Sequence, residues 1–93
     1  MFKVFSTPRA EKDLNKISEK IARVIFKEIL FLEKNPFPDG YRIKKIRRLF
    51  KPAKYELKVQ DYRVLFSMMS NKIIIGRIIH RKDLELALKK MRR

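Results

Sequence analysis

Cysteine is absent from the 93 residues of this chain, and histidine occurs once, as His80. The lack of cysteine excludes disulfides, zinc–thiolate sites and thiol nucleophiles. One histidine is too few for a metal site built on imidazoles, so we expect neither a metal nor another cofactor. No apolar run has the length of a membrane-spanning helix, and the apolar start at residues 1–5 is too short for a signal sequence. These absences predict a cytoplasmic protein that does not contact a membrane.

Acidic residues are scarce as well. Ten Asp and Glu residues face 25 Lys and Arg residues, which gives a formal net charge of +15. Such an excess of one sign destabilises a compact domain by self-repulsion and attracts nucleic acid. The alternative is a solvated, lysine-rich surface of the kind that thermophilic proteins carry, but those proteins add Glu alongside Lys. We therefore predict that the partner is a polyanion, and RNA before any other.

Apolar residues make up 45% of the chain, enough for one hydrophobic core but not for two, so we expect a single domain over residues 1–93. Thr7 and Pro8 are typical of the start of a helix. Apolar residues recur at helical spacing from there to residue 34, with Ser18 as the cap of a second helix over residues 19–34. The two helices predict an αα-hairpin. The expected buried stripe of the second helix comprises Ile21, Ile25, Ile29 and Leu32, widened by Val24, Phe26 and Leu30.

Beyond a turn at residues 35–40, which contains two prolines and a glycine, the apolar period changes to two. A period of two is typical of strands. The expected fold class is α+β, with an N-terminal strand, the αα-hairpin, then antiparallel strands forming one twisted sheet, and a C-terminal helix. Strands are predicted at residues 1–6, 43–48, 54–60, 62–69 and 72–80, and the last helix at residues 83–91.

Two hairpin turns set the expected register of the sheet. A turn at residues 60–61 places Lys58 directly opposite Arg63. A second turn at residues 70–71 places Arg63 opposite Ile78. Two cations that face each other on adjacent strands are destabilising by roughly 0.2–1 kcal/mol. An anion is therefore expected to offset their repulsion.

The predicted register also puts His80 on the same face as Lys58 and Arg63, opposite the face that carries the helical hairpin. One interpretation is a phosphate site, in which Lys58 and Arg63 hold the anion with His80 and Arg81 beside it. The other is structural: Glu56, diagonal to Arg63, supplies a salt bridge. His80 itself is either an ordinary polar residue at the end of a strand or a group that transfers protons.

Basic residues also precede this cluster in the sequence. Tyr55 and Tyr62 lie among them, and their place in the alternation predicts packing in the core rather than stacking on bases. Together the cations suggest a track for a polyanion, although each one alone is typical of an ordinary surface. The candidate RNA-binding residues are Arg42, Lys44, Lys45, Arg47, Arg48, Lys51 and Lys54.

An apolar strip is expected on the same face of the sheet, formed by Leu65, Ile74 and Ile78. Either a partner lays an amphipathic segment on it or the C-terminal helix at residues 83–91 covers it. The two alternatives are compatible if the helix covers the strip in the free protein and the partner displaces it on binding.

Three segments stand out together, namely residues 43–47 (IKKIR), residues 54–66 (KYELKVQDYRVLF) and residues 78–83 (IIHRKD). They resemble segments of the RelE/ParE superfamily of toxins. The order of strand, helical hairpin and remaining strands is similar to that family along nearly the whole chain. The resemblance implies a RelE-like fold and the toxin of a type II toxin–antitoxin pair.

RelE-like members of that family cleave mRNA in the ribosomal A site without a metal and leave a 2′,3′-cyclic phosphate. The resemblance implies that Arg63 stabilises the phosphate in the transition state, that Lys58 is a base or a second clamp, and that Arg81 holds the phosphate from the other side. His80 matches the position of an acid in some relatives, and Glu56 is a candidate base. The implied partners are mRNA, the ribosome at its 16S rRNA, and an acidic RelB-like antitoxin, for which the apolar strip is the candidate contact.

The sequence departs from the RelE-like pattern at two places. Glu56 stands where many of these enzymes carry Lys or Arg, and residues 85–87 (ELA) lack the tyrosine often found after HRKD. Both departures favour the first alternative function, a ParE-like inhibitor of DNA gyrase. The second alternative is an RNA-binding or ribosome-binding domain that is not an enzyme.

Overall fold

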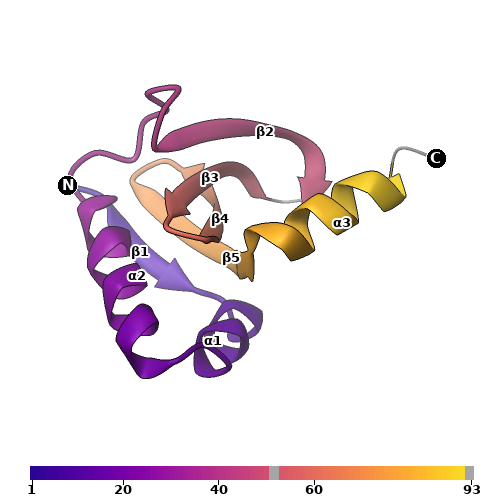
Figure 1. Cartoon of the computed structure of the whole chain (residues 1–93). Coiled ribbons are helices and arrows are strands. Elements are labelled where there is room, and N and C mark those ends of the chain that lie inside the picture. The colour runs from indigo at the N-terminus through magenta and orange to yellow at the C-terminus, as the bar shows by residue number, and fades with distance from the viewer. Residues whose placement is uncertain (51–52, 92–93) are drawn as a thin grey trace.

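The computed structural model describes residues 1–50 and 53–91, with residues 47–50, 88 and 91 described by their backbone alone. The predicted fold class is confirmed, with α1 and α2 next to each other and α3 at the C-terminal end (Figure 1). The elements in chain order are β1 (Lys3–Ser6), α1 (Pro8–Asn15), α2 (Glu19–Phe31), β2 (Ile43–Phe50), β3 (Ala53–Val59), β4 (Tyr62–Met69), β5 (Lys72–His80) and α3 (Arg81–Met91).

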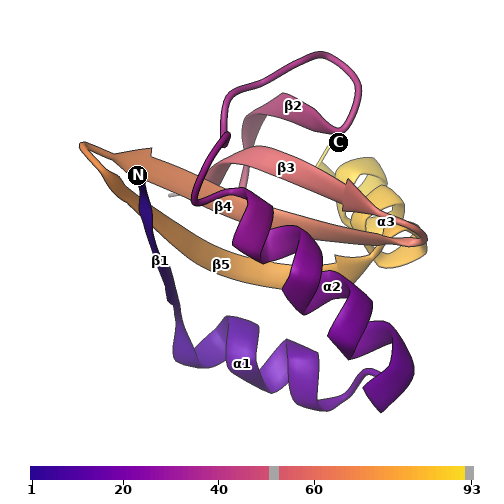
Figure 2. The ribbon, with the colours of Figure 1, turned by 90° about the vertical axis from the view of Figure 1, so that its left-hand side faces the viewer.

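The sheet has the strand order β1-β5-β4-β3-β2. β1 pairs with β5 in parallel, and the other neighbours are antiparallel. Figure 2 shows α1 and α2 on the near side of this sheet and α3 on the far side. The sheet therefore has two covered faces, one under the helical hairpin and the other, at one end, under α3.

The helical hairpin covers the main core. The α2 residues Ile25 and Ile29 are buried there against β-strand residues that include Leu57, Val64 and Phe66. α2 ends at Phe31, three residues before the predicted end. The prediction that Phe26 and Leu30 widen the buried stripe is wrong, because α2 turns them outward and they stay 55% and 44% exposed. Ser18 stands at the predicted cap position of α2, but its side chain makes no capping hydrogen bond.

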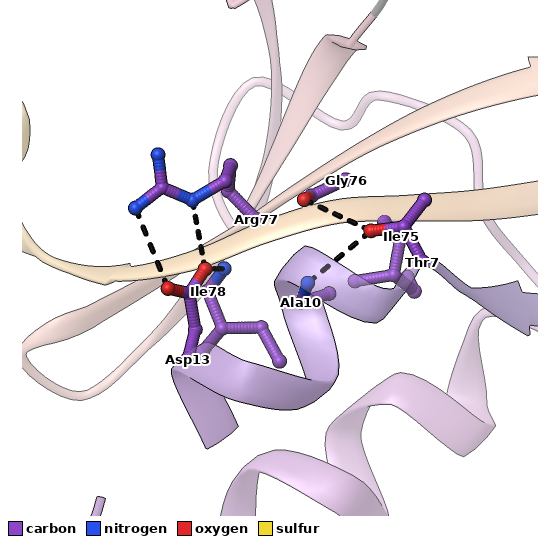
Figure 3. A network of polar contacts seen from close by, with 7 residues as sticks. All are labelled: Thr7, Ala10, Asp13, Ile75, Gly76, Arg77 and Ile78. Atoms are coloured by element: carbon purple, nitrogen blue, oxygen red, sulfur yellow. Dashed lines mark hydrogen bonds and ion pairs between the residues drawn. The ribbon is translucent and has the colours of Figure 1, made fainter. Parts of the chain in front are cut away.

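Polar contacts join α1 to β5 (Figure 3). The Thr7 hydroxyl accepts the N–H of Ala10 at 3.2 Å, as expected for an N-cap, and donates to the carbonyl oxygen of Ile75 at 3.0 Å. One turn later, the carboxylate of Asp13 accepts Nε–H of Arg77 at 2.8 Å and the backbone N–H of Ile78 at 3.0 Å. Both ends of α1 are thus bound to the same strand.

A bulge in β5 changes the predicted register. The pairing of Phe66 with Ile75 agrees with the prediction, but Leu65 pairs with Arg77, so Gly76 is an extra residue in β5. From that point on, each β5 residue is shifted by one position, and Arg63 faces Ile79 instead of Ile78. Because side chains alternate along a strand, this shift exchanges the faces of the last residues of β5.

A second, smaller core lies between the sheet and α3. It contains Ala53, Leu65 and Ile79 from the strands and Leu84 from α3, with Ile46 packed at its edge. α3 begins at Arg81, two residues before the predicted start, directly after β5. The structure therefore places the start of α3 at the same end of the sheet as the turn between β3 and β4.

The segment between α2 and β2 is organised by Asp39. Its carboxylate oxygen Oδ1 accepts the backbone N–H groups of Tyr41, Arg42 and Ile43 at 2.8–3.0 Å. These hydrogen bonds, that of Ile43 first, hold the pKa of Asp39 below its usual value of 3.8, because they stabilise the charged form. The result is a defined turn that delivers the chain into β2.

Candidate functional site

Lys58 and Arg63 form the centre of the candidate site. They are directly opposite each other on β3 and β4, as predicted. Leu65, two residues beyond Arg63, belongs to the small core under α3. Because alternate residues share a face, Lys58 and Arg63 lie on the α3 side of the sheet, away from the helical hairpin. Lys58 is exposed and Arg63 is half-buried.

The Arg63 side chain is held by the turn that joins β3 to β4. Its Nη1 donates to the carbonyl oxygens of Gln60 at 3.0 Å and Tyr62 at 2.9 Å. Gln60 has a φ of 53°, in the left-handed region that such turns use. Within residues 1–50 and 53–91, neither Lys58 nor Arg63 joins an ion pair. The site thus presents two adjacent cations, and the side chain of one of them, Arg63, is held by neutral carbonyl groups.

Glu56 lies on the same face, two residue pairs along from the two cations. It is half-buried between Lys44 on β2 and Leu65 on β4. The salt bridge from Glu56 to Arg63, which was the structural alternative, is not formed in the described part of the chain. Glu56 can therefore accept a proton or orient a nearby hydroxyl, but it does not neutralise Arg63.

His80 is not on the predicted face. The β5 bulge pairs it with Tyr62, and the two rings meet edge to face with centroids 5.2 Å apart. Tyr62 packs against the main core. The His80 side chain therefore leaves the sheet on the side of the helical hairpin, whereas the Arg63 side chain leaves it on the α3 side. Both remain at the same end of the sheet, because Arg63 and Tyr62 are adjacent in β4. The prediction placed His80 on the wrong face because it did not include the extra residue Gly76 in β5.

Arg81 is bound to the turn between β3 and β4. Its backbone N–H donates to the carbonyl oxygen of Asp61 at 2.7 Å, and its Nε lies 3.4 Å from the Asp61 carboxylate oxygen Oδ1. Both side chains are more than half exposed. Exposed pairs of this kind contribute little to stability, so Arg81 can exchange the carboxylate for another anion at small cost.

The described residues of the predicted basic track, Arg42, Lys44, Lys45 and Lys54, do not all lie on one face. Arg42 turns toward α2, where its guanidinium lies 3.4 Å from Glu28 Oε1 and 6.0 Å from the centre of the Phe31 ring. Lys44 lies opposite Glu56 in the strand register, on the α3 side of the sheet, whereas its neighbour Lys45 projects to the other face. Lys54 is exposed. Lys51 and the side chains of Arg47 and Arg48 lie outside the described residues.

The predicted exposed strip is also wrong for two of its three residues. Leu65 is fully buried in the small core under α3, so the alternative, coverage by the C-terminal helix, is confirmed there. Ile78 is 4% exposed in the main core, because the bulge turns it toward the hairpin. Ile74 stays half-buried beside β1, opposite Phe5.

An exposed apolar groove that the sequence did not predict lies between β1, α1 and α2. It has a volume of about 720 Å³, and Phe5, Phe26 and Leu30 line it while remaining 44–55% exposed. The signal for it was present in the wide apolar stripe of α2, which holds more large side chains than a short hairpin can bury.

Two kinds of site are not found in the described residues. No three His, Asp or Glu side chains there come together in a group that could hold a metal ion. None of the helices described is long and apolar enough to cross a membrane.

Comparisons with known proteins agree with the architecture. A family model described as "ParE toxin of type II toxin-antitoxin system, parDE" matches residues 4–85. No curated protein sequence matches the chain significantly.

Several solved structures share the fold. A RelBE toxin–antitoxin complex from Mycobacterium tuberculosis aligns with a TM-score of 0.73 at 23% identity, covering 86% of this chain and 98% of that one. An archaeal RelE–RelB complex from Pyrococcus horikoshii gives a TM-score of 0.70 at 21% identity and covers 86% and 94%. A mutant of the E. coli toxin RelE in the free state gives 0.72 at 17% identity and covers 96% of both chains.

Proposed function

Since the chain belongs to the RelE/ParE superfamily of type II toxin–antitoxin toxins, we propose that it is an endoribonuclease that cleaves mRNA on the ribosome. The observation that carries this proposal is the Lys58–Arg63 pair, two cations opposite each other on a rigid sheet with no carboxylate bound to either in the described residues. A phosphodiester is the ligand that offsets their mutual repulsion.

The chemistry that fits this site is attack of a ribose 2′-oxygen on the adjacent phosphorus. The P–O5′ bond breaks, a 2′,3′-cyclic phosphate remains on one product and a 5′-hydroxyl forms on the other. The 2′-hydroxyl loses a proton to a base, and the departing 5′-oxygen gains one from an acid. Charge accumulates on the phosphate oxygens in the transition state, where cations that are already in place stabilise it most.

In this proposal Arg63 binds the phosphate oxygens through the donors that its two carbonyl contacts leave free. Lys58, opposite it, is the second clamp or the base, with Glu56 as the alternative base two residue pairs away. Arg81 reaches the phosphate after leaving Asp61. His80 has its Nδ1 occupied by the N–H of Lys82 at 3.1 Å, so the neutral ring carries its proton on Nε2 and donates from there.

Substitution of Arg63 by Ala tests the proposal. We expect cleavage of mRNA in a ribosome-bound translation assay, read by primer extension, to fall by at least about a hundredfold, the scale on which removal of one such donor acts. Arg9→Ala is the matched control, because it removes an exposed arginine of α1. Equal cleavage by the two variants would remove Arg63 from the site, and stable ribosome binding without cyclic phosphate products would favour the RNA-binding alternative.

The partner that fits the toxin assignment is an acidic RelB-like antitoxin, since two of the similar structures are RelE complexes with their antitoxins. The net charge of +15 complements such a partner. Leu65 lies under α3, so contact with it requires the antitoxin to displace that helix. Hydrogen exchange at residues 81–91, measured with and without an acidic RelB-like antitoxin, tests the displacement: faster exchange in the complex supports it, and slower exchange contradicts it.

A ParE-like action on DNA gyrase is the second candidate, because the matching family model bears the ParE description. It predicts cleaved DNA complexes with gyrase in the presence of the protein and intact mRNA in the translation assay. Arg63→Ala would then leave the effect on gyrase unchanged.

A further inference from the structure

His80 stands at the junction between the sheet and the C-terminal helix. It is the last residue of β5, and α3 begins with the next residue, Arg81. The His80 Nδ1 accepts the backbone N–H of Lys82, the second residue of α3, at 3.1 Å. A side-chain acceptor in front of a helix that binds the N–H of the second or third helical residue is an N-cap. His80 therefore caps α3.

A histidine can cap a helix through Nδ1 in only one protonation state and tautomer. The bond from Lys82 requires a lone pair on Nδ1, so the ring must be neutral with its hydrogen on Nε2. Uptake of a proton places N–H on Nδ1, pointing at another N–H. It also adds a positive charge at the helix N-terminus, where the macrodipole is already positive. A stabilising contact thus becomes a repulsive one.

The attachment of α3 is weak enough for this change to matter. Of the α3 side chains that the structure describes, Leu84 alone is buried. The first turn is held in addition by the contact between the Arg81 N–H and the Asp61 carbonyl oxygen and by the exposed Arg81–Asp61 pair. In its described residues, α3 therefore resembles the parts of a fold that open locally at low free energy, which have few buried side chains and exposed polar contacts.

We propose that His80 is a pH-sensitive latch that holds α3 on the sheet when neutral and releases it when protonated. Release uncovers Leu65 and Ile79, the strand residues over which Leu84 lies. The latch does not depend on whether the protein cleaves RNA.

Other charged and titratable groups surround His80. Tyr62 on β4 contacts the ring, and Arg63 follows it; the turn contributes Asp61. The first turn of α3 adds two cations and one acid, which are Arg81, Lys82 and Asp83. Between about pH 5 and about pH 8, histidine is the side chain that ordinarily changes its charge. The acidic residue near the helix start offsets part of the new positive charge, but it does not restore the lost acceptor.

The tautomer can be measured directly, since His80 is the only histidine in the chain and its ring ¹⁵N signals are free of overlap. We expect ¹⁵N–¹H correlation spectra at about pH 8 to show a proton on Nε2 and a bare Nδ1. A neutral ring with its proton on Nδ1 would overturn the proposal, whatever the behaviour of any variant.

Hydrogen exchange at residues 81–91 tests the consequence, with α2 as the internal reference for the folded state. After correction for intrinsic rates, we expect protection of α3 to fall roughly fivefold (about 2- to 30-fold for a cap of ordinary strength) from about pH 8 to about pH 5, while α2 stays protected. Unchanged protection of α3 across this range would contradict the latch.

Two substitutions of His80 form a matched pair. His80→Asn keeps an acceptor near the position of Nδ1 but does not titrate, so protection of α3 should be high and independent of pH in this range. His80→Gln moves the amide toward the position of Nε2, so protection should be low at both pH values. If His80→Asn loses protection on acidification as the natural protein does, another group carries the effect and the proposal is wrong.

Discussion

The two faces of the sheet are covered to very different degrees. The helical hairpin seals one face with a core of twelve buried residues, whereas the core under α3 has four among the described residues. On the first face both ends of α1 are bound to β5, through Thr7 and Asp13. On the second face Leu84 is the one buried side chain among those described in α3, and Lys58 is exposed and Arg63 half-buried on the same face.

This difference suggests that the hairpin face stabilises the fold, while the α3 face carries the proposed site. The hairpin face buries the large side chains and stabilises the sheet. The sheet can therefore tolerate the repulsion between Lys58 and Arg63 on its other face. The α3 face is only partly closed, which leaves room for a polyanion and makes α3 the element that can move. The densely packed face thus supports a less densely packed one, which carries the proposed binding site.

Truncation of the hairpin core should have the largest effect. Phe66 is fully buried and stacks on Tyr55 with ring centroids 5.5 Å apart. We expect Phe66→Ala to lower the free energy of unfolding by about 3–5 kcal/mol, as chemical denaturation would measure. A loss below about 1 kcal/mol would mean that the main core is not what holds the sheet together.

Truncation of the smaller core should cost less and act locally. Leu84 is 8% exposed and belongs to the small core, together with Ala53, Leu65 and Ile79. We expect Leu84→Ala to lower the free energy of unfolding by about 2 kcal/mol, the low end for a buried leucine, and to raise exchange in α3 more than in α2. A loss equal to that of Phe66→Ala, spread evenly over the chain, would show that the two faces are not energetically distinct.

The ion pair that binds α1 to β5 should contribute a smaller amount. Asp13 and Arg77 are only 14% and 26% exposed at their side chains. Asp13→Asn keeps an acceptor for the Ile78 N–H but loses the charge, so we expect a loss of about 1.5 kcal/mol in denaturation. Glu19→Gln is the matched control, because its pair with Arg23 is 75–79% exposed and should contribute almost nothing. Equal losses in the two variants would contradict the assignment of α1 as a pinned element.

The smallest effect should appear at acid pH and concern the turn before β2. The pKa of Asp39 is held below 3.8 in the folded protein by the N–H groups of Ile43, Tyr41 and Arg42, so its stabilising contribution is complete above 3.8 and is lost as the pH falls below that value. We expect the stability difference between the natural protein and Asp39→Asn to shrink over that range in thermal melts. Parallel curves for the two proteins at acid pH would contradict the role of Asp39.

Much of the fold could be predicted from local patterns. Thr7 and Pro8 mark the start of α1 because capping depends on residues adjacent in sequence. The turn at residues 60–61 sets Lys58 opposite Arg63, because a short hairpin fixes its own register. The same argument failed for β5, because Gly76 is an extra residue there. An isolated glycine inside a strand is a local signal for a bulge, but whether the register shifts depends on contacts between strands.

Sequence by itself determined the order of the elements, the pair of cations on β3 and β4, and the excess of positive charge, because each depends on residue type and short-range spacing. The tertiary structure alone decided on which face each residue of β5 lies, which end of the basic track turns away to α2, and which apolar residues α3 covers. Those outcomes depend on packing between segments far apart in the chain, where a shift of one residue reverses a face. His80 is the clearest case: its place in the sequence suggested a neighbour of Arg63, and the fold made it the cap of a helix.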